Sequence, residues 1–456
     1  MPRQQAPDRI CRTVALYNAC IRMDVYTAAH RPPMFWVPTL YLAEGLPFYT
    51  VSLIAGLMYK SMGVANDVIT HWTGLLGLAW VLKPLWSPLL EAVPNKRILV
   101  LLFQALGAAA LGSVALSLQL PTWFPASIAA LMLVSLASAT HDTAADGLYI
   151  ASLSARQQAA YAGWQGAFFN VARFISLGGL VILAGCLEEH IAVAQAWTII
   201  FAVLALAMAS LGTYHLWSLP PSTITPRDDR LLGGIVAMLW DVVIDFFKKP
   251  GIWLAIAFIV LFRAGESQIQ TIGPLFLRDS RSAGGLGLTT DQVGIVYGTA
   301  GTVAFIAGSI SGGYFTSWLG LKRALPILIV AMNLPNLVFY CLSAAAPTNL
   351  SLIGGALSIE MFGYGFGFVG IILFIMQVVA PGRYVTAHYA LGTGLMQLGF
   401  VLFKVTSGDV QTALGYHNFF LWVLVSAIPA LLLAWFMPVP TESSASVHPA
   451  TQGGEA

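Results

Sequence analysis

The chain has 456 residues, of which 57% are hydrophobic and only 9% are charged, and its formal net charge at pH 7 is +2. Soluble domains carry about 25% charged residues, so a chain this poor in charge could not cover a surface that faces water. The composition therefore excludes a soluble globular protein and predicts an all-α polytopic membrane protein. The small net charge gives no reason to expect nucleic acid as a partner.

The sequence also lacks the patterns of several enzyme classes. It contains no Walker loop, no HExxH and no GxSxG, which argues against ATP-driven pumping and against hydrolysis. The four cysteines, Cys11, Cys20, Cys186 and Cys341, have neither metal-ligand nor paired spacing, and we expect free thiols. We therefore expect no enzyme, no metal and no cofactor.

Twelve apolar stretches are long enough to cross a bilayer, which takes about 20 residues in a helix. They lie at 36–59, 68–90, 98–118, 124–150, 159–185, 194–216, 251–277, 290–317, 324–344, 349–380, 386–408 and 417–437. The longest interruption separates the sixth from the seventh. It holds two consecutive prolines and an amphipathic piece around Met238–Phe247, which predicts a helix lying in the membrane interface.

This spacing divides the chain into five parts. Residues 35–218 and 251–438 are two halves of six helices each, and residues 219–250 are a cytoplasmic linker with the interfacial helix. Residues 1–34 form a cytoplasmic arm, and the small polar residues of 439–456 predict a disordered cytoplasmic tail. Two matching halves around a site near the bilayer midplane are typical of secondary transporters.

The basic residues favour one orientation. With the N-terminus in the cytoplasm, fifteen lysines and arginines fall in cytoplasmic segments, and only Lys60, Arg278 and Arg281 fall in outer loops. The positive-inside rule favours this arrangement, with both termini cytoplasmic. The other four basic residues lie within predicted spans: Lys83, Arg173, Arg263 and Lys404.

Two short inner loops resemble each other. Residues 86–97 read WSPLLEAVPNKR and residues 312–323 read GGYFTSWLGLKR, and the two loops occupy the same place in each half. They resemble the loop motif of the major facilitator superfamily, in which a glycine, an acid and basic residues clamp two helix ends. Glu91 stands at the place of the acid, and the second copy has Ser317 there. The resemblance assigns this gate to Glu91, Lys96, Arg97, Lys322 and Arg323.

Four further stretches carry a closer resemblance. They are VPTLYLAEGLPFYTVS in the first span, WVLKPLWSPLLEA after the second, ASATHDTAADGLYIASL in the fourth and EMFGYGFGFVGIILFIMQ in the tenth. Together they resemble the AmpG-type muropeptide permeases, a branch of the major facilitator superfamily grouped with acetyl-CoA transporters. The likeness covers most of residues 34–437. It implies a monomeric symporter of the bacterial inner membrane that imports anhydro-muropeptides with protons, for peptidoglycan recycling.

The fourth-span motif departs from that branch. The branch pattern is close to SQDIxxDAW, whereas this chain reads THDTAADGLY, with His141 at the place of Gln and no Trp. A siderophore-importing branch shares much of the same pattern. The resemblance therefore leaves two other solute classes open, siderophores and acyl-CoA compounds. A membrane receptor or enzyme that has kept the fold is the remaining alternative, but the polar residues are spread over six spans rather than gathered at one interface.

Two acids interrupt the apolar run of the fourth span. Asp142 and Asp146 are four residues apart and share one helix face. An ionisable group at the bilayer centre costs at least about 2.5–3.5 kcal/mol, so the acids must be protonated, paired or in contact with water. Arg173 of the fifth span lies at a similar depth, and we predict an Asp142–Arg173 pair. Both a proton-carrying role and a structural clamp explain the acids.

Other buried charges predict a polar path. Arg263 and Glu266 are three apart on one face of the seventh span and can pair. Gln268 and Gln270 extend that polar stretch by one turn. Glu44 precedes Gly45 and Pro47 in the first span, and helices broken in this way often line binding sites. Two further candidates are Glu360, as a second proton carrier, and Lys404, which either binds an anionic group or snorkels to the interface.

Some aromatic and histidine residues are weaker candidates. Trp164 and Gln165 together suit a sugar ring, because the amide can bond hydroxyl groups beside a stacked ring. His71, His141 and His388 have no metal-ligand spacing, and we expect hydrogen-bonding roles for them. Glycines at small-xxx-small spacing, Gly294 with Gly298 and Gly363 with Gly367, predict closely packed helices that can slide.

Overall fold

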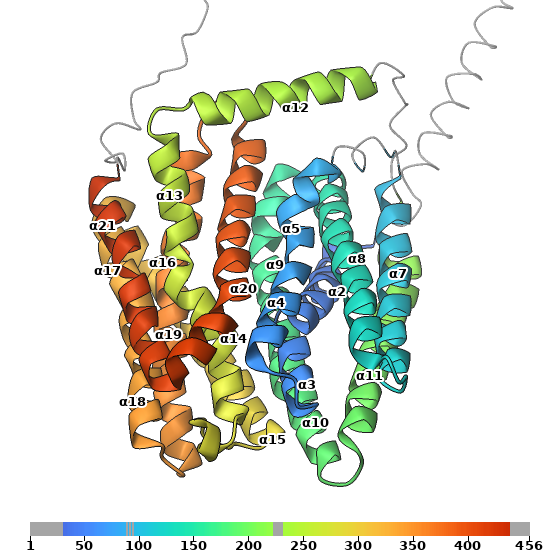
Figure 1. Cartoon of the computed structure of the whole chain (residues 1–456). Helices are drawn as coiled ribbons and strands as arrows, with labels where there is room; N and C mark the ends of the chain where they lie inside the picture. Colours follow the sequence, from blue (N-terminus) through green and yellow to red (C-terminus); the bar gives the residue numbers. More distant parts are fainter. Residues whose placement is uncertain (1–30, 88–89, 91–92, 94, 222–230, 438–456) are drawn as a thin grey trace, which may run out of the picture.

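The computed structural model describes residues 31–87, 90, 93, 95–221 and 231–437 of the chain. Every regular element in these residues is a helix, and most helices run side by side as a bundle (Figure 1). The predicted arm and tail, apart from a few residues at their inner ends, and residues 222–230 of the linker lie outside the described residues.

The first six predicted spans correspond to helices that alternate in direction. Several spans contain a π-helical or 3-10 turn, so each consists of more than one element. They are α2 (Val37–Tyr49) with η2 (Thr50–Ile54) and α3 (Ala55–Ser61); α4 (Asn66–Leu76) with α5 (Leu78–Leu82); α7 (Lys96–Ser117); α8 (Trp123–Ser152); α9 (Ala155–Arg173) with η4 (Phe174–Leu180) and α10 (Val181–Glu188); and α11 (Val193–Ser218).

The last six predicted spans correspond to five helical segments, because the eleventh and twelfth share α20. They are α13 (Ile252–Phe262) with α14 (Ala264–Arg278); α15 (Thr290–Val293) with η6 (Gly294–Ala300) and α16 (Gly301–Leu319); α17 (Leu321–Asn333) with α18 (Leu337–Ala345); α19 (Leu350–Phe374) with η8 (Ile375–Val379); and α20 (Val385–Ser426) with α21 (Ile428–Phe436).

Ten helical stretches of the described residues are long and apolar enough to cross a membrane. They differ from the twelve predicted spans in two places. The second span is the shorter pair α4 and α5, and α20 continues through the predicted gap between the last two spans. Gly415 breaks α20 at that gap, with φ 70° and ψ 164°. The protein is thus an all-helical bundle with about ten to twelve membrane-spanning helices.

Helix α12 (Leu231–Lys248) lies across the ends of the bundle (Figure 1). Lys249, which follows it, is fixed to the end of the tenth span. Its ammonium group donates to the carbonyl oxygens of Val379 at 2.6 Å and Pro381 at 2.8 Å. The His388 ring bonds the carbonyl oxygen of Val242 within α12 at 3.2 Å. These contacts attach α12 to the C-terminal half, residues 251–438.

The N-terminal half, residues 35–218, meets the C-terminal half along two seams. In one seam α4 packs against α20, and in the other η4 packs against η6 and α10 against α15. Glycine allows the second approach: a Cβ on Gly298 would lie 1.9 Å from the carbonyl oxygen of Leu177. Small residues at helix contacts let backbones come this close.

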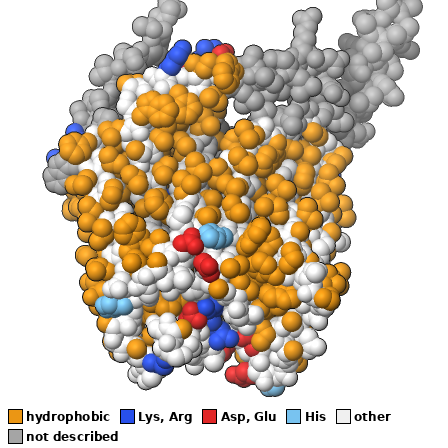
Figure 2. Space-filling model, viewed as in Figure 1, with side chains coloured by type: hydrophobic (Ala, Val, Ile, Leu, Met, Phe, Trp, Pro, Cys, Tyr) orange, Lys and Arg blue, Asp and Glu red, His pale blue; other side chains and the backbone are white. Residues whose placement is uncertain are grey.

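The contact between the halves tightens with distance from α12. Along α20, Met396 and Gln397 are half-buried, whereas Lys404 and Ser407, which lie farther from α12, are 3% and 0% exposed. The outside of the bundle is mostly hydrophobic, as a surface in contact with lipid should be. Figure 2 shows that charged and histidine side chains interrupt it mainly in the lower part of the view, away from α12.

Candidate functional site

A central cavity of about 250 Å³ lies between the two halves. Both halves contribute polar and aromatic side chains to its wall, as the predicted midplane site requires. The residues that line it include Phe48, Tyr49, Ser52, Phe169, Asn170 and Arg173 of the N-terminal half and Arg263, Glu266, Gln270, Phe305, Tyr364, Phe368, Gln397 and Phe400 of the C-terminal half.

Arg173 reaches from the N-terminal half into the C-terminal half. It is 3% exposed, and its guanidinium group lies 4.5 Å from the centroid of the Phe305 ring and 3.5 Å from the Met361 sulfur. It forms no ion pair with a carboxylate among the described residues, and its Nε has no hydrogen-bond partner there. A buried cation whose direct contacts are an aromatic face and a thioether is suited to bind an anionic group.

Arg263 and Glu266 form the pair that their spacing predicts. Arg263 Nε lies 3.0 Å from Glu266 Oε2, and both side chains are almost completely buried. The guanidinium group also lies over the rings of Phe400 and Phe368, at 4.8 and 5.2 Å from their centroids. Because both residues line the cavity, one charge of each sign faces any solute inside it.

Gln268 and Gln270 point in different directions. Gln270 lines the cavity and accepts a hydrogen bond from the Tyr297 hydroxyl at 3.1 Å. Gln268 instead packs within the C-terminal half, where it donates to Ser426 and accepts from Trp422. Residues two apart on a helix lie on nearly opposite faces, so of the two glutamines Gln270 faces this cavity, and a role for Gln268 in the path stays a prediction.

Lys404 and Glu360 are buried beside the cavity. The Lys404 ammonium group donates to the carbonyl oxygen of Ser52 at 2.9 Å, so Lys404 does not snorkel to the interface. Ser52 lies in the π-helical turn η2, and such turns are frequent at functional sites. Glu360 is 1% exposed, and its Oε2 has no hydrogen-bond partner among the described residues. Arg173 and Glu360 interact electrostatically across the seam.

A second polar site lies in the N-terminal half, nearer to α12. The carboxylates of Glu44, Asp142 and Asp146 lie within 4.8 Å of one another. The Lys83 ammonium group donates to Asp142, and the Tyr41 hydroxyl donates to Asp146 Oδ1 at 2.8 Å. The predicted Asp142–Arg173 pair is therefore wrong. Lys83, just beyond α5, reaches Asp142, whereas Arg173 lies farther along α9 and faces the central cavity.

This acidic cluster, Glu44 with Asp142, Asp146 and Lys83, is accessible to water. Asp146 is exposed, and Asp142 keeps 13% of its side chain exposed. Three carboxylates in this arrangement resemble the ligands of a hard cation. Lys83 supplies a positive charge at the cluster, so the close approach of the three carboxylates is explained without a metal ion. With three acids against one lysine, the cluster has the capacity to take up protons.

Two neighbouring contacts were not predicted from the sequence. Gln165 donates to the Tyr41 hydroxyl, so the two residues form a chain to Asp146. Gln104 lies between two buried histidines, with its Nε2 at 3.0 Å from His141 Nε2 and 2.7 Å from His215 Nδ1. The expected hydrogen-bonding role of His141 is confirmed.

Trp164 stacks on Phe168 with ring centroids 5.9 Å apart and stays 45% exposed, outside the cavity wall. Gln165, its predicted partner, also bonds elsewhere. A platform for a sugar ring at this pair stays a prediction. The aromatic rings that line the cavity are Phe48, Tyr49, Phe169, Phe305, Tyr364, Phe368 and Phe400.

The inner-loop motif is described in part. Lys96 donates to the carbonyl oxygen of Leu90 at 2.6 Å, and Arg97 donates to the carbonyl oxygen of Leu216 at the end of α11. Both basic residues thus bind backbone carbonyls at helix ends, where cations are favourable. Lys322 and Arg323 are exposed at the start of α17. Glu91 lies outside the described residues.

Comparison with known proteins agrees with this architecture. The family model of the Major Facilitator Superfamily matches residues 39–403. The anhydromuropeptide permease of Escherichia coli K12 is 27% identical over 404 residues, which cover 86% of this chain and 77% of that protein. The putative transporter AmpG 4 of Rickettsia felis is 22% identical over 419 residues, covering 89% of this chain and 96% of the relative.

Solved structures show the same fold at low sequence identity. A bacterial homolog of the human lysosomal transporter Spinster, inward-facing and unoccupied, matches with a TM-score of 0.69 at 12% identity, covering 90% of this chain and 97% of that one. A D-xylose–proton symporter matches with a TM-score of 0.65 at 12% identity, covering 90% and 98%. The chain belongs to the Major Facilitator Superfamily and is a secondary transporter of small molecules, not an enzyme.

Proposed function

We propose that this transporter imports anhydro-muropeptides together with protons across a bacterial inner membrane by alternating access, with α12 on the cytoplasmic face. The observation that carries the proposal is the pair of arginines in the central cavity, one from each half. A sugar–peptide carries carboxylates for the guanidinium groups and ring faces for the aromatic wall. The similarity to anhydromuropeptide permease supports this solute over others of like chemistry.

The charges favour an anionic solute. Arg263 is balanced by Glu266 at 3.0 Å, whereas Arg173 rests on Phe305 and Met361. Lys404 adds a third cation beside the cavity, held by a backbone carbonyl. A solute carboxylate would give Arg173 the direct ion pair that it does not form with any described residue.

The size of the cavity limits what it can hold. Ligand pockets commonly enclose about 300–1,000 Å³, and this cavity holds about 250 Å³. One sugar ring or one carboxylate-bearing group fits, but a whole disaccharide–peptide does not. The remainder of the solute would extend toward α12, where Met396 and Gln397 are half-buried and Asp146 is exposed.

Four acids remain proton-coupling candidates, namely Asp142, Asp146, Glu266 and Glu360, and we favour Glu360. It is buried, and it interacts with Arg173 across the seam. A solute anion bound at Arg173 neutralises the positive charge that faces Glu360, and a proton on Glu360 then restores neutrality. Solute and proton would thus occupy the closed cavity together, as symport requires.

The test is uptake of radiolabelled anhydro-muropeptide into proteoliposomes with an imposed pH gradient, with and without a protonophore. We expect accumulation that the protonophore abolishes. Arg173→Gln and Arg263→Gln should each lower the initial rate at least about tenfold, because a charge-assisted hydrogen bond contributes about 1.5–3 kcal/mol.

Arg281→Gln is the matched control for these variants. Arg281 bonds the carbonyl oxygens of Ala346 and Pro347, far from the cavity, so its loss should leave the rate within about twofold. Absence of uptake by folded wild-type protein with an intact gradient would exclude this solute. The same assay would then be applied to a siderophore and to an acyl-CoA compound.

A further inference from the structure

Arg278 and Asp279, at the end of α14, both bind the opposite half. They lie on the face of the bundle away from α12, where α3 turns into α4 and α10 ends (Figure 1). Two adjacent residues of opposite charge therefore meet the N-terminal half at two points.

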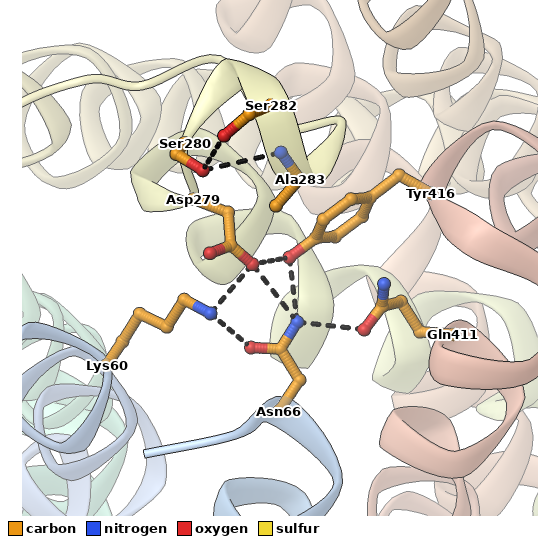
Figure 3. A network of polar contacts seen from close by, with 8 residues as sticks. All are labelled: Lys60, Asn66, Asp279, Ser280, Ser282, Ala283, Gln411 and Tyr416. Atoms are coloured by element: carbon orange, nitrogen blue, oxygen red, sulfur yellow. Dashed lines mark hydrogen bonds and ion pairs between the residues drawn. The ribbon is translucent and has the colours of Figure 1, made fainter. Parts of the chain in front are cut away.

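Asp279 receives three donors on one carboxylate oxygen. Lys60 Nζ lies 2.7 Å from Oδ2, the Tyr416 hydroxyl 2.5 Å and Asn66 Nδ2 3.4 Å (Figure 3). Lys60 and Asn66 belong to the N-terminal half, and Tyr416 belongs to the C-terminal half. The Lys60 and Asp279 side chains are 13% and 19% exposed, so the pair is screened from most of the solvent.

Asn66 extends the contact to α20. Its Nδ2 lies 2.8 Å from Gln411 Oε1 and 2.7 Å from the Tyr416 oxygen, while its Oδ1 accepts from Lys60 at 2.8 Å (Figure 3). One side chain of the N-terminal half thus bonds three residues of the C-terminal half, Asp279, Gln411 and Tyr416.

Arg278 forms a second ion pair between the halves, in which the C-terminal half supplies the positive charge. Its guanidinium group lies 3.4 Å from Glu188 Oε2 at the end of α10. Thr290 of the C-terminal half donates to the same oxygen, and Trp197 of the N-terminal half donates to Oε1 at 2.8 Å. Glu188 is therefore held in place from both halves.

A third contact between ionisable side chains joins the halves on the same side. His71 of α4 lies 2.8 Å from Asp409 of α20, with both side chains about half exposed. All three pairs lie away from α12, on the side where the cavity is closed. The backbones also meet there: a Cβ on Gly185 would lie 2.1 Å from the Asp291 nitrogen.

We propose that Lys60–Asp279 and Glu188–Arg278 form an electrostatic lock that holds this face of the transporter shut. The N-terminal half contributes the positive group to one pair and the negative group to the other. Only one alignment of the halves therefore places opposite charges together, and a shifted alignment would bring like charges together. When the halves separate, the four charged groups regain water, and this hydration offsets part of the attraction that opening removes. The lock thereby favours the closed state of this face without making opening irreversible.

The test measures the distance between the halves and needs no solute. Spin labels are placed at Thr122→Cys and Thr348→Cys, which are exposed on the locked face, in a chain whose four native cysteines are replaced by Ser. Double electron–electron resonance should give a single short distance for the otherwise unchanged chain. Lys60→Asp and Asp279→Lys should each add a longer population. The double exchange Lys60→Asp with Asp279→Lys should restore the short distance.

Arg281→Gln is the control, because Arg281 bonds only backbone carbonyls of its own half in the described structure. It should leave the distance distribution unchanged. Asp279→Asn removes the charge but keeps the size of the side chain, and it replaces the charge-reversed variants in the test if those chains do not fold. A short distance that persists in Asp279→Asn or in both reversals, or a double exchange that stays long, would overturn the lock. Neither result bears on which solute is carried.

Discussion

At the scale of single residues, the partner of Asp142 shows what spacing can and cannot predict. The sequence places Lys83 and Arg173 in two different predicted spans, and both side chains could reach the depth of Asp142. The choice between them depends on helix rotation and packing, which the sequence pattern does not fix. The structure places Lys83 on Asp142 and Arg173 on Phe305. The N-terminal half therefore has its own charge pair, separate from the central cavity.

A double-mutant cycle tests that assignment. Lys83→Met and Asp142→Asn should be non-additive by about 0.5–3 kcal/mol in the free energy of unfolding, because each removes the same interaction. Arg173→Met and Asp142→Asn should be additive within about 0.5 kcal/mol. The measurement is reversible unfolding by SDS in mixed micelles. Coupling in the second cycle and additivity in the first would restore the pair that the sequence suggests.

At the scale of helices, the two glycine pairs found in the sequence lie at different kinds of helix contact. A Cβ on Gly363 or Gly367 would meet α17 carbonyl oxygens at 2.4 and 2.3 Å, inside the C-terminal half. A Cβ on Gly294 or Gly298 would instead meet the N-terminal half across the seam. The sequence predicts the close approach in both cases. It does not distinguish a fixed contact within one half from a contact that must open during transport.

Gly298→Ala should weaken the closed state of the face away from α12. The added methyl group would lie 1.9 Å from the Leu177 carbonyl oxygen, a distance that forces the seam apart. Using the same spin-label pair, we expect a longer distance for this variant. Gly179→Ala is the matched control, because a Cβ there meets nothing within 4 Å. Equal distances in the two variants would contradict a seam held shut by glycine contacts.

At the scale of the whole molecule, composition and span spacing were enough to predict the helical bundle, and the superfamily followed from the resemblance of the inner-loop and span motifs. They also predicted the Arg263–Glu266 pair, because its members are near neighbours on one helix. The lock was not predictable: Lys60 and Asp279 lie at the ends of helices α3 and α14 in different halves, and in the sequence each resembles an ordinary charge near an outer loop. The contacts of Arg173 with Met361 and Phe305 depend likewise on how two halves pack.

The central claim is that one cavity between the halves opens to one face at a time. The most direct measurement is the reaction of a single thiol, Asn170→Cys in a chain without native cysteines, with a membrane-impermeant maleimide added from either side of sealed proteoliposomes. Asn170 lines the cavity. We predict labelling from the α12 side alone in the chain with an intact lock, and additional labelling from the opposite side once Lys60→Asp is introduced. Labelling from the α12 side alone in both chains, or from neither side in either chain, would contradict the account.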